Sequence, residues 1–194
     1  MTKVLPLVAL LLILGGCSDG PPRVEESPPA TTTVAFDQEL HDELVAMMAA
    51  DQGERTGGGT LDDTGRTERL KEIIGEHGWP TWDLVGEDGE EAAWVIAQHS
   101  DLDPEFQAEA LELLRAAVEE GQASPGNLAY LEDRVRAGRG EPQLYGTQTG
   151  CTRGGEPAMP DIEDPDGLDA RREAAGLPPY DRYLRQMTRV CARG

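Results

Sequence analysis

The sequence predicts a mainly α-helical protein built around a single compact multi-helix domain, residues 36–194. Apolar residues recur three and four positions apart through most of this region, which is the period of one face of an amphipathic helix. Proline and glycine stand where several of these stretches begin and end, as they do at helix boundaries. No apolar–polar alternation is long enough to predict a regular strand, and the lack of a repeat period disfavours a helical solenoid.

Three predicted helices follow one another between residues 36 and 98. The apolar face of the first is Phe36, Leu40, Leu44, Met47 and Met48, and that of the second is Leu70, Ile73, Ile74 and His77. The third extends over residues 90–98. We expect Glu90 and Glu91 to complement the positive N-terminal end of its dipole.

Four further helices are predicted in the second half of the domain. One opens at Asp103-Pro104 and the next at Ser124-Pro125, in each case a capping side chain followed by a proline in the first turn. Residues 168–175 and 180–190 form two shorter helices. Before them, residues 149–167 are a long irregular loop rich in Gly, Pro and Asp, a kind of segment that is often functional or poorly ordered.

Polar side chains gather in residues 143–148, just before this loop. The segment can form a short β segment, in which alternation would place Gln143, Tyr145 and Thr147 on one side. Together with Gln148, these amides and hydroxyls suit a buried network that fixes the segment to the helices. They equally suit a pocket for a polar ligand such as a peptide or a sugar.

The N-terminal residues have the order of a secretory signal peptide. A positive charge at Lys3 is followed by an apolar stretch over residues 4–14 and then by small residues. The stretch is too short for a transmembrane helix, which needs about 20 apolar residues. The sequence Leu14-Gly15-Gly16-Cys17 resembles the lipobox of bacterial lipoproteins, whose cysteine receives a diacylglyceryl group before cleavage. We therefore expect residues 1–16 to be removed and Cys17 to be lipidated.

A lipidated Cys17 would carry two or three acyl chains such as palmitate, which anchor stably in a membrane where one chain is marginal. Residues 17–35 include a Pro- and Thr-rich run without apolar periodicity, and they are predicted to be a tether. In an extended state the tether reaches up to roughly 50 Å. The sequence thus predicts a protein held on the extracytoplasmic face of the cell membrane.

The chain is strongly acidic, with 17 Lys and Arg residues against 37 Asp and Glu residues and a net charge of −20. Removal of residues 1–16 takes away Lys3 alone among the charged residues, which makes the net charge −21. This balance argues against nucleic acid and anionic lipid surfaces as partners, because basic patches bind both. Solubility is the simpler explanation of the acidity, and an acidic docking surface is the alternative.

Cys151 and Cys191 are the two cysteines besides Cys17. Disulfides persist outside the cytoplasm, and a bridge between these two would close a loop of about 40 residues, worth about 4 kcal/mol in the chain-entropy model. Two unpaired buried thiols are the alternative. We expect the disulfide, on the condition that the two α-carbons come within bonding range.

Several motifs occur in one order along the chain. They are Asp51-Gln52-Gly53-Glu54-Arg55, Gly78-Trp79-Pro80, the stretch 92–101 ending in Gln98-His99-Ser100-Asp101, the stretches 129–135 and 143–148, Asp169-Ala170-Arg171-Arg172 and Gly176-Leu177. In these motifs the chain resembles an exported bacterial domain family of unknown function, numbered 6624, over about residues 36–185. That family brings no established activity, so the resemblance implies a shared fold and no mechanism.

His99 is the candidate for acid–base chemistry, because Asp101 follows it closely and a carboxylate can orient an imidazole. A cell-envelope hydrolase would use His99 as its base, with Asp101 or Asp133 orienting the ring and Arg134 or Gln148 stabilising charge. The simpler explanation of His99 is an interaction with the negative end of its helix. Asp51 and Arg55, four residues apart on the first helix, are expected to form a structural ion pair.

A binding or interaction domain without catalysis is the leading functional hypothesis. No nucleophile with its base, phosphate loop or dinucleotide fingerprint can be named, and no histidine pair has the spacing of a zinc site, so no cofactor or metal is predicted. A peptide, sugar or protein ligand would contact Trp79, Trp94, Gln98, His99, Tyr145 and Gln148. The envelope hydrolase and a purely structural envelope lipoprotein are the two alternatives, and whether the chain is an enzyme stays open.

Overall fold

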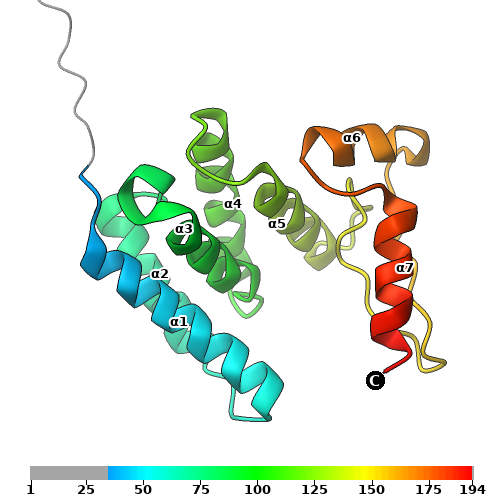
Figure 1. The fold of residues 1–194 in the computed structure, drawn as a ribbon, viewed down its shortest axis with the longest axis horizontal. Coiled ribbons are helices and arrows are strands. Elements are labelled where there is room, and N and C mark those ends of the chain that lie inside the picture. The colour runs from blue at the N-terminus through cyan, green and yellow to red at the C-terminus, as the bar shows by residue number, and fades with distance from the viewer. Residues whose placement is uncertain (1–34, 194) are drawn as a thin grey trace, which may run out of the picture. The chain divides into compact units, whose positions relative to one another are not determined.

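The computed structural model describes residues 35–193, in which the chain forms seven α-helices and one 3-10 turn (Figure 1). The elements are α1 (Gln38–Gly57), α2 (Asp63–His77), α3 (Trp82–Gln98), α4 (Pro104–Glu119), α5 (Pro125–Gly138), η1 (Pro165–Gly167), α6 (Leu168–Ala174) and α7 (Tyr180–Cys191). The predicted mainly α-helical class is confirmed. Within the described part of the chain, no helix has the length and apolar character needed to cross a membrane. The predicted signal peptide and Cys17 lie outside these residues.

Capping side chains set the start of several helices. The carboxylate of Asp37 accepts hydrogen bonds from two backbone N–H groups in the first turn of α1, and Asp103 and Ser124 cap α4 and α5 in the same way. Each cap satisfies N–H groups that have no partner inside the helix, which is worth about 1 kcal/mol. Proline follows Asp103 and Ser124 in the first turn, as the sequence predicts.

The hydrophobic core lies around α3, which packs against α1, α2, α4 and α5. Each of these helices contributes fully buried aliphatic side chains, among them Leu44, Leu70, Ile96, Leu114 and Leu131. Truncation of such a side chain to alanine costs about 2–5 kcal/mol, since it removes buried apolar surface and leaves a cavity. The α3 helix is therefore held in place from several sides, and its end is a rigid position for a functional side chain.

The short β segment that residues 143–148 could form is reduced to a single bridge. Among the described residues Gln143 makes only an isolated bridge with Ile162, and no strand is present. The reason lies in Asp133 of α5, whose carboxylate accepts the backbone N–H groups of Leu144, Tyr145 and Thr147. Those N–H groups are thus unavailable to a β ladder. The long irregular loop predicted for residues 149–167 is present, with η1 at its end.

The third helix begins earlier than expected, at Trp82, and is kinked at Gly86. Gly86 has φ 77°, a left-handed conformation that breaks the helix and favours glycine. Glu90 therefore lies near the start of the part of α3 that follows the kink, as expected, but its side chain is only 1% exposed. Because the kink interrupts the apolar periodicity of α3, the sequence pattern does not predict the residues before Glu90 as helical.

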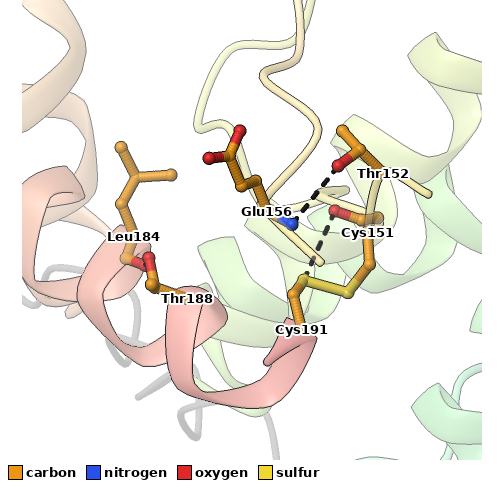
Figure 2. Close-up of a disulfide and its surroundings, with 7 residues drawn as sticks. Cys151, Thr152, Glu156, Leu184, Thr188 and Cys191 are labelled. Carbon is orange, nitrogen blue, oxygen red and sulfur yellow. Dashed lines mark hydrogen bonds between the residues drawn. A yellow bond between two sulfur atoms is a disulfide. The ribbon is translucent and has the colours of Figure 1, made fainter. Parts of the chain in front are cut away.

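The predicted disulfide between Cys151 and Cys191 is confirmed, with their α-carbons 5.4 Å apart. It joins the irregular loop to the C-terminal end of α7 (Figure 2). Close to the bridge the loop folds back on itself, because Glu156 N–H donates to the Thr152 hydroxyl over 3.2 Å. The disulfide therefore fixes a segment that has no regular secondary structure of its own.

Candidate functional site

The packing of α1 on α3 brings together a buried carboxylate and a histidine that are 48 residues apart in the sequence. Asp51 on α1 is completely buried, and His99 is the residue that ends α3. The His99 Nδ1 atom lies 2.9 Å from Asp51 Oδ2. Because an ionised carboxylate only accepts hydrogen bonds, Nδ1 carries the hydrogen and donates it to Asp51. This leaves Nε2 as the ring nitrogen available to a ligand or a water molecule.

The Asp51 carboxylate is stabilised by further donors. Gln52 Nε2 donates over 2.7 Å and Arg55 Nε over 3.0 Å, and the Arg66 guanidinium of α2 lies 3.7 Å away. The expected pair of Asp51 with Arg55 is thus present. A carboxylate removed from water needs such compensation, since burial without partners costs several kcal/mol. Asp51 therefore holds α1, α2 and the end of α3 together.

Burial lowers the pKa of the His99 imidazole below its ordinary value of 6.5, although the negative charge of Asp51 opposes the shift. Arg55 and Arg134, both positively charged, add to the lowering. The ring is therefore neutral at pH 7, and its contact with Asp51 is a hydrogen bond of neutral imidazole rather than an ion pair. A neutral, oriented imidazole can accept a proton or a hydrogen bond at Nε2.

A cavity of about 340 Å³ opens beside this histidine. We call it the α1–α3 cavity, since Met48 and Gln52 come from α1 and the other lining residues come from α3 and its end; these are Glu91, Trp94, Val95, Gln98 and His99. Two of the lining side chains have buried polar atoms without a hydrogen-bond partner among residues 35–193, namely Gln98 Oε1 and Trp94 Nε1. Buried polar atoms are normally paired, so these two mark a place for a ligand.

The Gln98 side chain is held in place by a hydrogen bond to Gln148. Its Nε2 donates to Gln148 Oε1 over 3.3 Å, and Arg134 Nη1 donates to the same oxygen over 3.2 Å. Arg134 in turn pairs with both carboxylate oxygens of Asp101. Neither Arg134 nor Asp101 lines the cavity; their hydrogen bonds reach it through Gln148 and Gln98, and Arg134 also acts on His99 through its charge.

Asp133 belongs to a closed structural network rather than to the cavity. Its carboxylate is fully buried and accepts backbone N–H groups of Leu144, Tyr145 and Thr147 together with the Thr147 hydroxyl. Gln143 adds two hydrogen bonds to the backbone of Gln148. Of the two explanations that the sequence left open for residues 143–148, the structure shows a network that fixes this segment to α5.

The structure thus brings together three of the six predicted ligand-binding residues, Trp94, Gln98 and His99, in one cavity. Gln148 supports them, while Trp79 is buried in the core and Tyr145 is half-buried in the segment that Asp133 holds. Asp51 is the carboxylate that orients His99, whereas Asp101 and Asp133 have the other partners described above. Among residues 35–193 no group of His, Cys, Asp and Glu side chains is arranged to hold a metal ion.

The sequence did not predict that residues of α1 line the α1–α3 cavity. Met48 counted only as a residue of the apolar face, and Gln52 only as part of a motif, yet both line the cavity. Helical periodicity gives the direction of a side chain on its own helix, but it does not say which helix lies opposite. A signal was nevertheless available, since Gln52 adjoins Asp51 and stands one helical turn after Met48.

A larger cavity of about 560 Å³ lies beside the irregular loop and the start of α7. Tyr180 lines it, and this tyrosine has a buried hydroxyl without a partner among the described residues. The ring itself is only partly buried, and none of the predicted site residues reaches this cavity. Size alone does not outweigh the converging polar groups of the α1–α3 cavity, so we place the candidate site there.

These features define a helical domain with a cavity next to an oriented histidine. The chain belongs to a family described as a family of unknown function (DUF6624), whose model matches residues 57–192. This match confirms the resemblance to family 6624 for the motifs from Gly78 onward, and the motif at residues 51–55 lies outside the matched range. No curated protein and no solved structure matches the chain.

Proposed function

We propose that this chain is a lipid-anchored, extracytoplasmic binding domain and that the α1–α3 cavity holds a small polar ligand. The observation that carries the proposal is that Gln98 and Trp94, which both line one cavity, each have a buried polar atom without a partner among residues 35–193, Gln98 Oε1 and Trp94 Nε1. The first needs a hydrogen-bond donor and the second an acceptor. A ligand that offers both a donor and an acceptor could form hydrogen bonds with both side chains. His99 Nε2 can accept a further hydrogen bond.

Sugars and peptides meet this requirement, because hydroxyl and amide groups both donate and accept. The volume of about 340 Å³ is near the lower end of the range for ligand pockets, which favours a ligand the size of a monosaccharide or a dipeptide. Met48, Val95 and the Trp94 ring supply apolar surface for the face of a sugar ring or a short side chain. A protein ligand would insert a single side chain or sugar group into this cavity.

Calorimetric titration with N-acetylglucosamine and with glycylglycine tests this proposal. We expect at least one of the two probes to bind, and Gln98→Ala to weaken that binding about tenfold, since one hydrogen bond to a buried group is worth about 1.5 kcal/mol. Gln38→Ala removes an exposed amide at the start of α1 and serves as the matched control. Failure of both probes to bind, or equal affinity of the Gln98→Ala variant, contradicts the proposed function.

The lipid anchor is tested separately at Cys17. Intact-mass measurement of protein extracted from membranes should give the mature chain from Cys17 plus two or three acyl chains. A Cys17→Ala variant should lose both the acyl mass and its place in the membrane fraction. Equal membrane association of this variant would show that another feature holds the protein there.

A second candidate function, hydrolysis, is favoured by the contact between Asp51 and His99. Asp51 fixes the tautomer that leaves Nε2 able to take a proton from a water molecule, which is the task of a general base. No serine, threonine or cysteine lines the α1–α3 cavity, so water would be the nucleophile. In this reaction the water proton passes to Nε2 while the water oxygen attacks the substrate, and the leaving group later takes the proton.

Hydrolysis is tested with p-nitrophenyl acetate and p-nitrophenyl N-acetylglucosaminide. The hydrolase proposal expects turnover of one of them, lowered about 10²- to 10⁴-fold in His99→Gln. Asp51→Asn should lower the rate as well, because an amide can donate to Nδ1 and thereby select the wrong tautomer. An activity that survives the His99→Gln change belongs to a contaminant and ends the hydrolase proposal.

A further inference from the structure

A second cavity, of about 280 Å³, shares the lining residue Glu91 with the α1–α3 cavity. We call it the α3–α5 cavity, because its lining comes from α3 and from the start of α5; the residues are Trp82, Glu87, Glu90, Glu91, Ser124 and Asn127. The kink at Gly86 separates Trp82 from the three glutamates along α3 and lets both parts of the helix border one space. Nothing in the proposed function accounts for this cavity.

Glu90 is the unusual residue of the α3–α5 cavity. It is only 1% exposed, and its Oε2 accepts one hydrogen bond, from Asn127 Nδ2 over 3.2 Å. Its Oε1 is buried without a well-aligned hydrogen bond among residues 35–193. The donors that approach the carboxylate, the Trp79 and Trp82 indoles and the Ser124 backbone N–H, are all uncharged. A buried carboxylate normally has a positively charged partner or several donors, as Asp51 does.

Positive charge is missing from this cavity in the described part of the chain. None of the lining residues is Lys, Arg or His, and none of the three glutamates takes part in an ion pair. The lining therefore combines up to three negative charges, one of them buried, with the indole of Trp82. Carboxylates and an indole face are the groups that proteins use to bind ammonium and guanidinium ions.

We propose that the α3–α5 cavity binds an organic cation, the guanidinium or ammonium group of an arginine or lysine side chain. The cation supplies the positive charge that Glu90 lacks among the described residues, pairs with Glu87 and Glu91 at the wall and packs against Trp82. The carboxylates do not converge closely enough to hold a metal ion, which distinguishes this site from a divalent cation site. A planar guanidinium with its five donors fits several separated acceptors best.

The ionisation of Glu90 also favours a cation ligand. Burial raises the pKa of the Glu90 carboxyl to about 7. The other titratable groups that line the cavity are Glu87 and Glu91, both on α3, whereas α5 and its cap contribute only the uncharged Ser124 and Asn127. A bound cation favours the ionised form of Glu90, so its affinity should rise as the pH is increased from 6 to 8.

The test uses L-arginine amide as the probe and L-citrulline amide, which has nearly the same shape without the side-chain charge, as its control. In calorimetric titrations of the intact protein at pH 8 and low salt, L-arginine amide should bind and L-citrulline amide should bind at least tenfold more weakly. Glu90→Gln should weaken binding of L-arginine amide at least tenfold. The change Glu112→Gln, at an exposed glutamate of α4, should leave it unchanged.

Three results would overturn the cation site. They are equal binding of the two amides, unchanged affinity in the Glu90→Gln variant, and displacement of L-arginine amide by equimolar Ca²⁺, which would indicate a metal site instead. Glu87→Gln alters an exposed position that leaves the buried side chains in place, and it should weaken binding less than Glu90→Gln does. Gln98→Ala should have no effect on L-arginine amide, so this site and the α1–α3 cavity can fail independently.

Discussion

At the scale of single residues, two buried carboxylates on neighbouring helices show opposite arrangements. Asp51 has donors from α1, from α2 and from His99 at the end of α3, so its charge is compensated inside the protein. Glu90 accepts one hydrogen bond, from the uncharged amide of Asn127. The first arrangement stabilises the fold and orients a histidine. The second leaves a group whose ionisation the protein disfavours and a ligand could favour.

Asp51→Ala should lower the free energy of unfolding by about 3 kcal/mol, because it leaves Arg55, Arg66 and His99 without their shared acceptor. Urea denaturation followed by circular dichroism measures this change. Asp181→Ala is the control, since Asp181 is exposed and pairs only with Arg185 on the surface of α7, and its loss should cost less than 1 kcal/mol. Similar losses in the two variants would contradict the role of Asp51.

Because of the Glu90 carboxyl, the free energy of unfolding should fall as the pH rises. Its pKa in the folded chain, about 7, lies above the ordinary value of 4.5, so the folded state binds the proton more tightly than the unfolded state. Its contribution is therefore fully present below pH 4.5 and is lost as the pH rises through 7. At one pKa unit per 1.36 kcal/mol, the loss is about 3 kcal/mol.

Glu90→Gln removes this titration and should become more stable than the original protein as the pH rises. The difference in free energy of unfolding between the two proteins should grow by about 3 kcal/mol from pH 5 to pH 8. Urea denaturation at a series of pH values gives this difference directly. A difference that stays constant with pH would show that Glu90 titrates alike in the folded and unfolded chain.

At the scale of elements, the segment after α5 is held by a side chain rather than by secondary structure. Asp133 accepts three backbone N–H groups of residues 144–147, a role that a β ladder would otherwise fill. Asp133→Ala should release this segment, and amide hydrogen exchange at residues 144, 145 and 147 should then become at least tenfold faster. Slow exchange at those amides in the variant would mean that other contacts hold the segment.

The disulfide gives the irregular loop its second attachment, at the end of α7 (Figure 2). Reduction should lower the free energy of unfolding by about 4 kcal/mol, the value for a closed loop of this length. Thermal unfolding with and without a reductant measures the change, with the Cys151→Ala and Cys191→Ala double variant as a control that a reductant cannot affect. Equal melting temperatures of the oxidised and reduced protein would contradict a stabilising role.

The helices themselves were predictable because each one carries a local signal. Apolar spacing and the capping pairs Asp103-Pro104 and Ser124-Pro125 lie within a few residues of the structure that they specify. The kinked start of α3 and the absent strand at residues 143–148 were not predictable in this way. The kink depends on the conformation of Gly86. The missing strand depends on the Asp133 carboxylate, which is 11 residues before Leu144 in the sequence.

At the scale of the whole molecule, the candidate site depends on how helices pack against one another. His99, Gln98 and Trp94 could be named from the sequence because they share one helix and include the polar groups of its end. The sequence could not single out Asp51 from Asp101 and Asp133 as the partner of His99, because lateral packing decides which of these carboxylates meets the ring. The predicted anchor at Cys17 remains a prediction, while the described domain has two cavities lined by residues of α3.

The indole N–H of Trp94 is a direct reporter of ligand binding, because Trp94 lines the α1–α3 cavity and its N–H has no hydrogen-bond partner among residues 35–193. We predict that titration of ¹⁵N-labelled protein with N-acetylglucosamine or glycylglycine shifts the indole resonance of Trp94, while that of Trp79 in the core stays in place. Assignment by Trp94→Phe identifies the signal. An unmoved Trp94 resonance at saturating concentrations of both probes would contradict the binding site that we assign to this cavity.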